Sequence, residues 1–483
     1  MDLFAQLARQ GAMIARLCAD SRRAGPGVAF FAWPGERADG RGYIAEAIGR
    51  GTAAVVWEAE GFAWRPEWRV PNAAVAGLRR QAGALAHAFY GQPSEALWTC
   101  GVTGTNGKTT CSQWIAAALG GAGRKCGVIG TLGAGFPGAL EDAGHTTPDV
   151  LELHRLLADF RGAGAGAVAL EVSSHALVQG RVDGVAFDCA LFTNLTHDHL
   201  DYHGTMHAYG EAKARLFDGA GLECAVLNLD DAFGVQLAAR LAARGVRTIG
   251  YRLTPGNAPG EHLVASRIVG RRVTIDSSWG TAEATVPALG TYNVANALGV
   301  AGALVASGMA FPDAVRALER LPEVPGRMQR LGGERAPLVV IDYAHSPDAL
   351  ENVLRALRPE ADARSGALAV VFGAGGDRDR AKRAPMGRIA ARLADRVVLT
   401  SDNPRSEDPL AILREIAGGI EGPCEQEADR ARAIQAAVAA AQDVDVVLIA
   451  GKGHEDTQEV AGRRLPFSDA EVARAALARR GKR

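Results

Sequence analysis

The chain has 483 residues, and its Lys and Arg (53) balance its Asp and Glu (54), which leaves a formal net charge of −1 at pH 7. A balanced charge gives no field that attracts nucleic acid or an anionic membrane, so both kinds of partner are disfavoured. The cysteines (7) are scattered without a C-x-x-C pair, which disfavours a disulfide framework and a zinc site and fits a reducing compartment. We therefore expect a cytoplasmic enzyme of about three domains. We also expect a monomer, although the sequence does not determine the oligomeric state.

The first part of the chain, residues 1–95, is predicted to form a small α/β domain. Short apolar strands at 28–33 and 53–57 alternate with helical stretches, and a helix is expected over 74–90. The first residues lack a basic region leading into an apolar core, so we expect no secretory signal. The run Gly-Gln-Pro-Ser at 91–94 ends the helix and marks the first domain boundary.

A glycine-rich loop at 101–110, Gly-Val-Thr-Gly-Thr-Asn-Gly-Lys-Thr-Thr, lies between a predicted strand at 97–102 and a predicted helix at 111–119. Glycines in such a loop let backbone N–H groups converge on phosphates, and the helix N-terminus adds its dipole. Lys108 supplies a positive charge, and the Thr109 hydroxyl can ligate Mg²⁺. We predict an ATP site formed by Gly104, Thr105, Asn106, Gly107, Lys108, Thr109 and Thr110.

The loop departs from the strict G-x-x-x-x-G-K-T pattern, because Val102 stands where the first glycine belongs. It is therefore a variant of the phosphate loop. A simple glycine turn before a buried helix is the alternative interpretation. That alternative explains the glycines, but it does not explain why Lys108 and two threonines follow them.

Residues 96–328 are predicted to form a central domain with a mainly parallel sheet, from apolar strands at 126–129, 167–170, 189–192 and 225–227. The second of these strands runs into Glu171, and in phosphate-loop enzymes an acid at this place supplies the second magnesium contact. Thr, Val and Gly between residues 262 and 287 indicate antiparallel strands. The uncharged stretch 284–312 is interrupted by Pro and Asn, so we predict a buried core helix there and no membrane span.

Residues 329–483 repeat one pattern, a buried strand followed by a polar cluster. The strands are predicted at 339–342, 367–372, 396–400 and 444–449, and the clusters at 342–345, 375–378, 402–405 and 451–455. The carboxyl ends of the strands in an open α/β sheet line its binding crevice, so the four clusters should meet in one site. The charges at 377–383 suit a carboxylate-bearing substrate held by Arg, with a solvated helix start as the alternative.

Three other patterns point to different functions. The run His-Asp-His-Leu-Asp-Tyr-His at 197–203 resembles the H-x-H-x-D-H signature of metallo-β-lactamase-type hydrolases, with its last His one place late. A polar surface loop is the alternative. Because a hydrolase site would leave the phosphate loop unexplained, we interpret one histidine as a magnesium or transition-state ligand.

The glycines at 373–376 do not match the G-x-G-x-x-G fingerprint of NAD-binding proteins, since Arg378 stands at the position of its third glycine. No Asn is followed by Lys, so the base-reading N-K-x-D element of a GTPase is absent.

Taken together, these motifs resemble those of the Mur ligases, and within them the branch that adds diaminopimelate. The resemblance covers the whole chain, and the order and spacing of the motifs are more specific than any one of them. The markers are Asp20-Ser21-Arg22, the loop at 101–110, Thr146-Thr147-Pro148-Asp149, Glu171-Val172-Ser173-Ser174-His175, Thr193-Asn194-Leu195, Asp198-His199-Leu200-Asp201, Tyr292-Asn293-Val294-Ala295-Asn296, Pro325-Gly326-Arg327-Met328, Asp342-Tyr343-Ala344-His345 and Asp402-Asn403-Pro404-Arg405.

The resemblance implies a three-domain ligase of peptidoglycan-precursor synthesis. Such an enzyme transfers the γ-phosphoryl group of ATP to a carboxylate of UDP-N-acetylmuramoyl-L-alanyl-D-glutamate, and the amine of meso-2,6-diaminopimelate attacks the acyl phosphate. The resemblance places Lys108 on the phosphates, has Thr109 and Glu171 hold one Mg²⁺, and has His199 ligate another. Lys213 matches a family lysine that becomes an N-carbamate able to bind magnesium, whereas a surface helix lysine is the alternative.

The same resemblance assigns substrate contacts. Asn296, Arg327 and Asp342 would hold the adenosine end of ATP, and Ser21, Thr146, Thr147, Ser173, Gln179 and Arg181 would hold the UDP-muramoyl dipeptide. Family members often carry His-Gln-Ala where this chain has Glu36-Arg37-Ala38, a departure that affects the uridine contacts. The diaminopimelate pocket would be formed by Arg378, Asp402, Asn403, Pro404, Arg405, Gly451 and Glu455; lysine-adding relatives lack the Arg at position 405.

Three alternatives remain open. A folylpolyglutamate or cyanophycin-type ligase shares the phosphate loop, but it would not be expected to carry the first domain with Asp20-Ser21-Arg22. A regulatory nucleotide-binding protein would need no amine pocket. A metallohydrolase would work without ATP.

Overall fold

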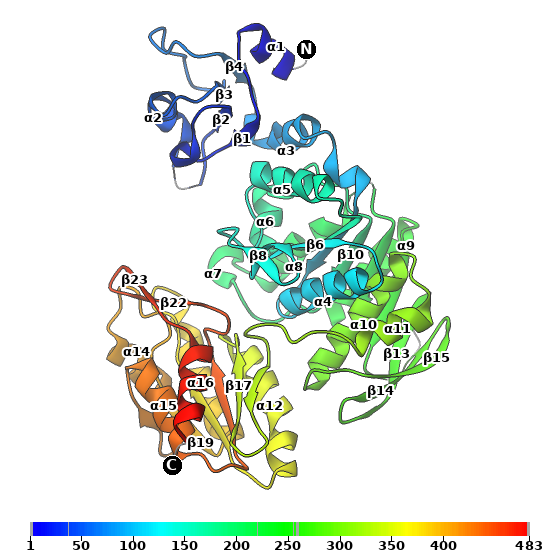
Figure 1. The fold of residues 1–483 in the computed structure, drawn as a ribbon, viewed down its shortest axis with the longest axis vertical. Helices are drawn as coiled ribbons and strands as arrows, with labels where there is room; N and C mark the ends of the chain where they lie inside the picture. Colours follow the sequence, from blue (N-terminus) through cyan, green and yellow to red (C-terminus); the bar gives the residue numbers. More distant parts are fainter. Residues whose placement is uncertain (1–2, 37, 220, 255, 257–259, 481–483) are drawn as a thin grey trace.

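The computed structural model describes residues 3–36, 38–219, 221–254, 256 and 260–480. The expectations for the N-terminal residues 1–2 and for Arg37 in the first domain concern positions outside the described residues. Three sheets with flanking helices follow one another along the long axis of the molecule (Figure 1). The predicted three-domain α/β architecture is confirmed, and none of the helices in the described ranges is long and apolar enough to cross a bilayer.

The first sheet has four parallel strands in the order β1-β2-β3-β4. Its strands and helices are α1 (Leu3–Arg9), β1 (Arg16–Cys18), β2 (Val28–Ala32), α2 (Ile44–Gly49), β3 (Ala54–Glu58), β4 (Asn72–Val75) and α3 (Leu78–Phe89). The prediction of a helix from residue 74 was wrong, because Ala74 belongs to β4. The helix begins only after Gly77, where the Glu58 carboxylate accepts hydrogen bonds from the backbone N–H groups of Gly77 (2.9 Å) and Leu78 (2.8 Å).

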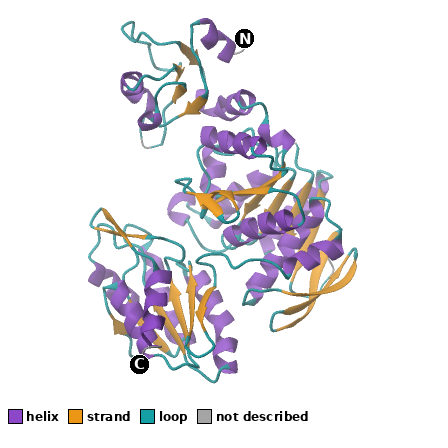
Figure 2. Cartoon of the chain, in the orientation of Figure 1, coloured by secondary structure: helices purple, strands orange, loops and turns teal. Residues whose placement is uncertain are grey.

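The central sheet has 11 strands in the order β15-β14-β13-β12-β11-β10-β5-β9-β6-β7-β8. The strands are β5 (Trp98–Thr103), β6 (Cys126–Gly130), β7 (Gly133–Phe136), β8 (Ala139–Glu141), β9 (Ala167–Glu171), β10 (Cys189–Phe192), β11 (Cys224–Asn228), β12 (Arg247–Arg252), β13 (Glu261–Val269), β14 (Arg272–Ser277) and β15 (Gly280–Thr285). The predicted parallel centre is confirmed, as are the antiparallel strands β13–β15, which extend one end of the sheet (Figure 2). The antiparallel strands β7 and β8 at the other end were not predicted.

The helices of the central part are α4 (Lys108–Gly121), α5 (Val150–Gly162), α6 (Ser174–Gln179), α7 (Leu200–His203), α8 (Met206–Ala214), α9 (Ala232–Ala243), α10 (Thr291–Ala306) and α11 (Phe311–Leu318). Helix α4 starts at Lys108, within the glycine-rich run 101–110 and three residues earlier than expected from the hydrophobic pattern. The uncharged stretch forms the buried helix α10, which is shorter than the stretch because it begins only after Gly290. Its apolar side chains belong to the same core as those of α4.

The last sheet has six strands in the order β16-β17-β21-β18-β19-β20, and a separate hairpin, β22–β23, follows it. The elements are β16 (Gln329–Gly332), β17 (Leu338–Asp342), α12 (Pro347–Ala363), β18 (Leu368–Phe372), α13 (Arg383–Leu393), β19 (Arg396–Leu399), α14 (Pro409–Ala417), β20 (Glu425–Gln426), α15 (Arg430–Ala440), β21 (Val446–Ala450), β22 (Thr457–Val460), β23 (Arg463–Pro466) and α16 (Asp469–Arg480). Strands β17, β21, β18 and β19 are parallel neighbours, so their carboxyl ends lie along one edge.

Candidate active site

The glycine-rich loop between β5 and α4 is held from behind by the end of β10. The backbone N–H of Thr105 donates to the carbonyl of Asn194 (2.8 Å), and the N–H of Asn106 donates to the Asn194 side-chain oxygen (2.9 Å). The Thr193 hydroxyl donates to the carbonyl of Asn106 (2.6 Å). Gly107 has φ 88°, and a Cβ there would lie 2.5 Å from the side-chain oxygen of Asn296. The loop is therefore fixed in shape by a second strand and needs glycine where α10 approaches it.

Two lysine ammonium groups meet at the carbonyl of Gly104. Lys108 Nζ donates to this oxygen (2.9 Å) and to the carbonyl of Thr105 (2.8 Å). Lys213, from α8, is fully buried, donates to the same Gly104 oxygen (2.8 Å), and lies 4.3 Å from the Tyr209 ring centre. Burial lowers the pKa of Lys108, and burial together with the nearby charge of Lys108 lowers the pKa of Lys213 well below its ordinary value. In the described ranges, neither ammonium forms an ion pair with a carboxylate.

A buried carboxylate lies beside the loop, at the end of β9. Glu171 accepts hydrogen bonds from the Thr109 hydroxyl (3.0 Å) and from both the backbone N–H (2.8 Å) and hydroxyl (3.1 Å) of Thr131. The Thr109 hydroxyl in turn accepts a hydrogen bond from Arg327 (3.0 Å). The two residues predicted to share a magnesium ion are thus side by side, at the N-terminus of α4.

His199 lies at the start of α7 with a φ of 53°. Desolvation inside the cavity lowers its pKa to about 4; nearby Asp198 opposes this shift, and Lys108 reinforces it. A neutral imidazole at pH 7 retains a lone pair for a metal ion. Across the described ranges, no group of three or more His, Cys, Asp and Glu residues is arranged to hold a metal by itself.

The loop opens into a cavity of about 500 Å³ that is bounded by the central and the last sheets. Residues predicted to bind nucleotide or magnesium line it: Thr105, Asn106, Gly107, Lys108, Thr109, Thr110, Glu171, His199, Lys213, Asn296, Arg327 and Asp342. The Arg327 guanidinium stacks 4.4 Å from the Tyr343 ring centre, and its Nε is buried without a hydrogen-bond partner among the described residues. Asn106 also donates to Asp348 (3.1 Å), so the last domain closes one side of this cavity.

A second cavity, of about 960 Å³, adjoins the first, because Thr146, Ser173, Asp198, His199, Tyr343 and His345 line both. Thr147, Gln179 and Arg181, which are predicted to hold the muramoyl dipeptide, line the second cavity together with Glu36 and Arg79 from the first domain. Arg181 donates to the carbonyl of Thr147 (2.9 Å) and to the side-chain oxygen of Gln179 (2.9 Å). Ser21 lines neither cavity, since its buried hydroxyl donates to Glu46 (3.1 Å).

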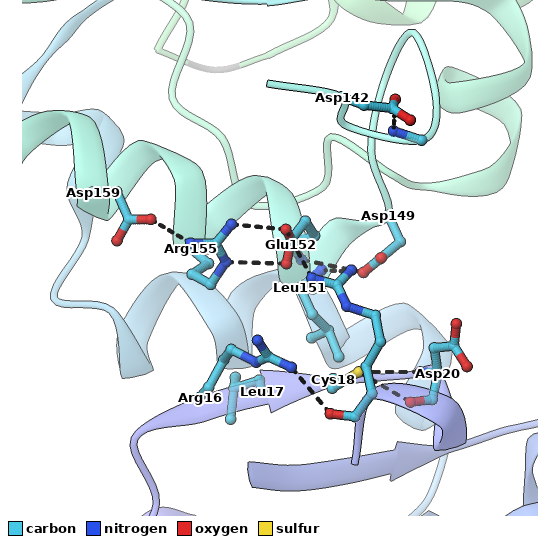
Figure 3. Close-up of polar contacts among 12 residues, drawn as sticks. Arg16, Leu17, Cys18, Asp20, Asp142, Asp149, Leu151, Glu152, Arg155 and Asp159 are labelled. Carbon is cyan, nitrogen blue, oxygen red and sulfur yellow. Dashed lines mark hydrogen bonds and ion pairs between the residues drawn. The ribbon is translucent and has the colours of Figure 1, made fainter. Parts of the chain in front are cut away.

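Polar side chains fasten the first domain to the start of α5 (Figure 3). Asp149 caps this helix by accepting from the backbone N–H of Glu152 (3.2 Å). The Glu152 carboxylate accepts from Arg155 (2.7 Å) and, across the junction, from Arg23 (3.1 Å). The segment that carries Ser21 is therefore joined to the first turn of α5.

The four polar clusters of the last sheet meet as predicted, because residues from all of them line the second cavity: Tyr343, His345, Gly375, Arg378, Asp402, Asn403, Arg405, Gly451 and Glu455. Arg405 has a φ of 51°; its Nη1 donates to the carbonyl of Gly376 (2.7 Å), and its Nε lies 3.3 Å from the carboxylate of Glu459 on β22. Gly451 is required here, since a Cβ would lie 2.5 Å from an oxygen of Asp402. Pro404 does not line the cavity.

The prediction that the whole charged run at 377–383 faces a substrate was wrong in part. Arg383 is buried and pairs with Glu407 (2.8 Å) and Glu415 (2.8 Å), and Arg380 also pairs with Glu415. These carboxylates come from α14 and the loop before it, so the pairing is not evident from the local sequence. Arg378, Asp379 and Lys382 do line the cavity.

Several polar groups at the site were not predicted. Buried Lys452 pairs with Glu455, and Arg430 forms a fully buried two-bond ion pair with Asp469, with both distances 2.7 Å. Arg430 also donates to the carbonyl oxygens of Ser401 (3.1 Å) and Ala450 (2.9 Å), directly before Asp402 and Gly451. Lys452 lies within the cluster at 451–455, but its burial and partner depend on the tertiary structure.

Comparison with known proteins gives a consistent result. Three family models match successive parts of the chain: "Mur ligase family, catalytic domain" (residues 13–90), "Mur ligase middle domain" (102–304) and "Mur ligase, glutamate ligase domain" (326–453).

The similar relatives include proteins named UDP-N-acetylmuramoyl-L-alanyl-D-glutamate--2,6-diaminopimelate ligase. The protein from Ralstonia nicotianae is 52% identical over 482 residues, covering 97% of this chain and 94% of its own. The protein from Chromobacterium violaceum is 50% identical over 481 residues, covering 99% and 97%. A solved structure with the same name is 36% identical in sequence and has a TM-score of 0.68. The match covers 97% of this chain and 95% of the chain in that structure.

Proposed function

The chain belongs to the Mur ligase family, and we propose that it is the ATP-dependent ligase that adds meso-2,6-diaminopimelate to UDP-N-acetylmuramoyl-L-alanyl-D-glutamate in peptidoglycan-precursor synthesis. In this reaction the γ-phosphoryl group of ATP moves to the substrate carboxylate, and the amine of diaminopimelate displaces phosphate from the acyl phosphate. The observation that carries the proposal is the junction of the two cavities. The phosphate loop opens into one, the four polar clusters open into the other, and His199 and Ser173 line both.

The phosphate loop supplies positive charge where phosphoryl transfer needs it. Among the described residues Lys108 donates only to carbonyl oxygens, so a polyphosphate that enters the cavity finds an ammonium group that no carboxylate neutralises. Lys108 would stabilise the charge of the transferring group, and the loop N–H groups with the α4 N-terminus would hold the adjacent phosphates. Asn296, Arg327 and Asp342 would bind the adenosine end.

The residues present fit a magnesium ion. Mg²⁺ in phosphoryl-transfer sites is held by one or two protein oxygens together with substrate phosphates and water, so it needs no cage of protein ligands. The Thr109 hydroxyl and the Glu171 carboxylate lie 3.0 Å apart beside the loop, and His199 offers a neutral imidazole. When bound, the ion would neutralise phosphate charge and polarise the group being transferred.

Lys213 is suited to become an N-carbamate. Carbamate formation on CO₂ requires an unprotonated amine, and the lowered pKa of this buried lysine favours that form. The product is an anion beside Lys108, able to contribute a magnesium ligand.

The remaining substrates are assigned to the second cavity. Thr146, Thr147, Ser173, Gln179 and Arg181 would hold the muramoyl dipeptide, and Ser21 would act on the uridine end only after rearrangement of its bond to Glu46. Arg378, Asp402, Asn403, Arg405, Gly451 and Glu455 would bind diaminopimelate, with Pro404 shaping the loop. We assign residues 1–95 to UDP binding, 96–328 to ATP and 329–483 to the amino acid, in a monomer of the cytoplasm.

The test is a reconstitution in which ATP, magnesium, UDP-muramoyl dipeptide and meso-diaminopimelate are omitted one at a time. We expect the tripeptide product by mass spectrometry, with ADP and phosphate released in equal amounts, and hydroxylamine should trap the acyl phosphate when diaminopimelate is left out. Ligation of glutamate to a folate in its place would identify the other ligase class. Nucleotide binding without turnover on any acceptor would identify a regulatory protein, and product formation without ATP would indicate a hydrolase-type reaction run in reverse.

A further inference from the structure

Lys452 lies directly after β21, in the loop that carries Gly451 and Glu455. Its side chain is 0% exposed, and its ammonium donates to one oxygen of Glu455, Oε2 (2.6 Å), and to the side-chain oxygen of Asn403 (3.0 Å). Burying an ammonium group is expensive unless it is paired and hydrogen-bonded, so such a lysine is kept only where its contacts matter. Both of its partners line the cavity that we assign to the amino acid.

The three side chains fix one another in a single arrangement. Asn403 donates through Nδ2 to Glu455 Oε2 (2.9 Å), the same oxygen that Lys452 contacts. The Asn403 side-chain oxygen accepts from Lys452 and from the backbone N–H of Glu459 (2.9 Å). With donors on both sides of this oxygen, turning the amide over would set its NH₂ group against the Lys452 ammonium and the Glu459 N–H. Lys452 is therefore one of the groups that fix the orientation of Asn403.

The consequence for Glu455 is asymmetric. Its Oε2 is saturated by Lys452 and Asn403, whereas its Oε1 accepts no hydrogen bond from the described residues, and the side chain is 30% exposed toward the cavity. An amino-acid substrate brings an ammonium group, which needs a carboxylate oxygen with free lone pairs. Oε1 of Glu455 offers such an acceptor.

We propose that Lys452 is a positioning residue for the amino-acid substrate: by holding Oε2 of Glu455 and the amide of Asn403, it presents Glu455 Oε1 to the substrate ammonium. The inference rests on the proposed function of the second cavity, and it assigns to Lys452 no contact with the substrate itself. Lys452 would act on the binding of diaminopimelate and leave the binding of ATP and of the muramoyl dipeptide unchanged.

The test compares steady-state constants of four proteins: the native chain, Lys452→Met, Glu455→Gln and the double variant. Hydrogen bonds to charged groups correspond to roughly 10- to 100-fold in an equilibrium constant, so Lys452→Met should raise KM for diaminopimelate by about that factor. The KM values for ATP and UDP-muramoyl dipeptide should change by less than about 3-fold. In the Glu455→Gln background, Lys452→Met should add little, because the residue acts through that carboxylate.

Arg364→Met is the matched control for loss of a structural cation. Arg364 donates to carbonyl oxygens of Gly333 (2.7 Å) and Asp443 (2.7 Å) at the opposite end of the sheet, so this variant should lower Tm without a selective change in any KM.

A uniform rise of all three KM values in Lys452→Met, or independent effects that multiply in the double variant, would overturn the positioning role. If Lys452→Met does not fold, Glu455→Gln is compared with the double variant instead. Nearly equal KM values for diaminopimelate in these two proteins would support the inference. A difference of about 10-fold or more would overturn it. Failure of the native chain to ligate diaminopimelate would overturn this inference and the proposed function together; a selective failure in the variants would concern Lys452 alone.

Discussion

The phosphate-loop cavity and the amino-acid cavity differ in how their positive charges are partnered. Lys108 and Lys213 donate to backbone carbonyl oxygens and, in the described ranges, form no ion pair with a carboxylate. Beside the second cavity, the fully buried cations Lys452 and Arg430 are paired with Glu455 and Asp469, and Arg405 contacts Glu459. The first arrangement suits a polyanion that brings its own negative charge, and the second suits a zwitterion that brings charges of both signs. This difference supports the proposal that ATP binds in the first cavity and the amino acid in the second.

Removal of Lys108 should have the largest effect. Lys108→Met leaves the glycine loop and its β10 contacts in place but removes the ammonium that would stabilise the transferring phosphoryl group. We expect kcat to fall by roughly 10³-fold or more without a decrease in Tm. A folded variant with near-native kcat would show that the cavity's unpaired charges have no catalytic use.

Removal of Lys213 should separate activity from stability. Burial lowers the pKa of the Lys213 amine in the folded protein below its ordinary value of 10.5. Between these two pKa values the unfolded chain binds more protons than the folded chain, so burial of this amine destabilises the folded state. In CO₂-free buffer, Lys213→Met should therefore raise Tm at pH 7, and the gain should shrink as the pH approaches 10.5.

The same variant should lose most ligase activity, by roughly 10²-fold or more, if a carbamate at this position holds magnesium. Added short carboxylates should restore part of it. Full activity of the native enzyme without bicarbonate, together with an unmodified lysine by mass spectrometry, would contradict the carbamate assignment.

Arg405 tests the paired side of the comparison. Its contacts with Gly376 and Glu459 hold the guanidinium at the cavity wall, so it can receive the distal carboxylate of diaminopimelate as a fork. Arg405→Ala should lower kcat/KM for diaminopimelate by roughly 10²-fold and narrow the preference over L-lysine, and Arg405→Lys should recover little. Equal losses for ATP and for both amino acids would show that Arg405 is structural.

Glu459 should give the smallest effect. Its side chain is 35% exposed, and exposed ion pairs contribute about 0–1 kcal/mol, so Glu459→Gln should change kcat/KM for diaminopimelate by only about 2- to 5-fold. Thermal melting provides the check that the hairpin β22–β23 is intact. A loss as large as that of Arg405→Ala would mean that the carboxylate orients the fork more strongly than its exposure suggests.

The parts of the site that depend on local sequence could be predicted. The phosphate loop, the acid at the end of β9 and the four strand-end clusters are each set by a few adjacent residues whose backbone geometry follows from their order. The errors arose where a distant residue decides: Glu58 delays the start of α3, and Glu407 and Glu415 draw Arg383 and Arg380 away from the cavity. Ser21 was expected to face a substrate, but its hydroxyl is bonded to Glu46. Lys452 carried a local signal in its flanking glycines, yet only the packed structure shows its partners.

The discrimination between meso-diaminopimelate and L-lysine, measured with UDP-muramoyl dipeptide and ATP at saturation, tests the account most directly. L-Lysine lacks the distal carboxylate, so it would leave the guanidinium of Arg405 without its substrate partner in a partly desolvated pocket. The account predicts a kcat/KM ratio of roughly 10³ or more in favour of diaminopimelate. A ratio near one, or a preference for lysine, would contradict the assignment of the paired cavity to diaminopimelate.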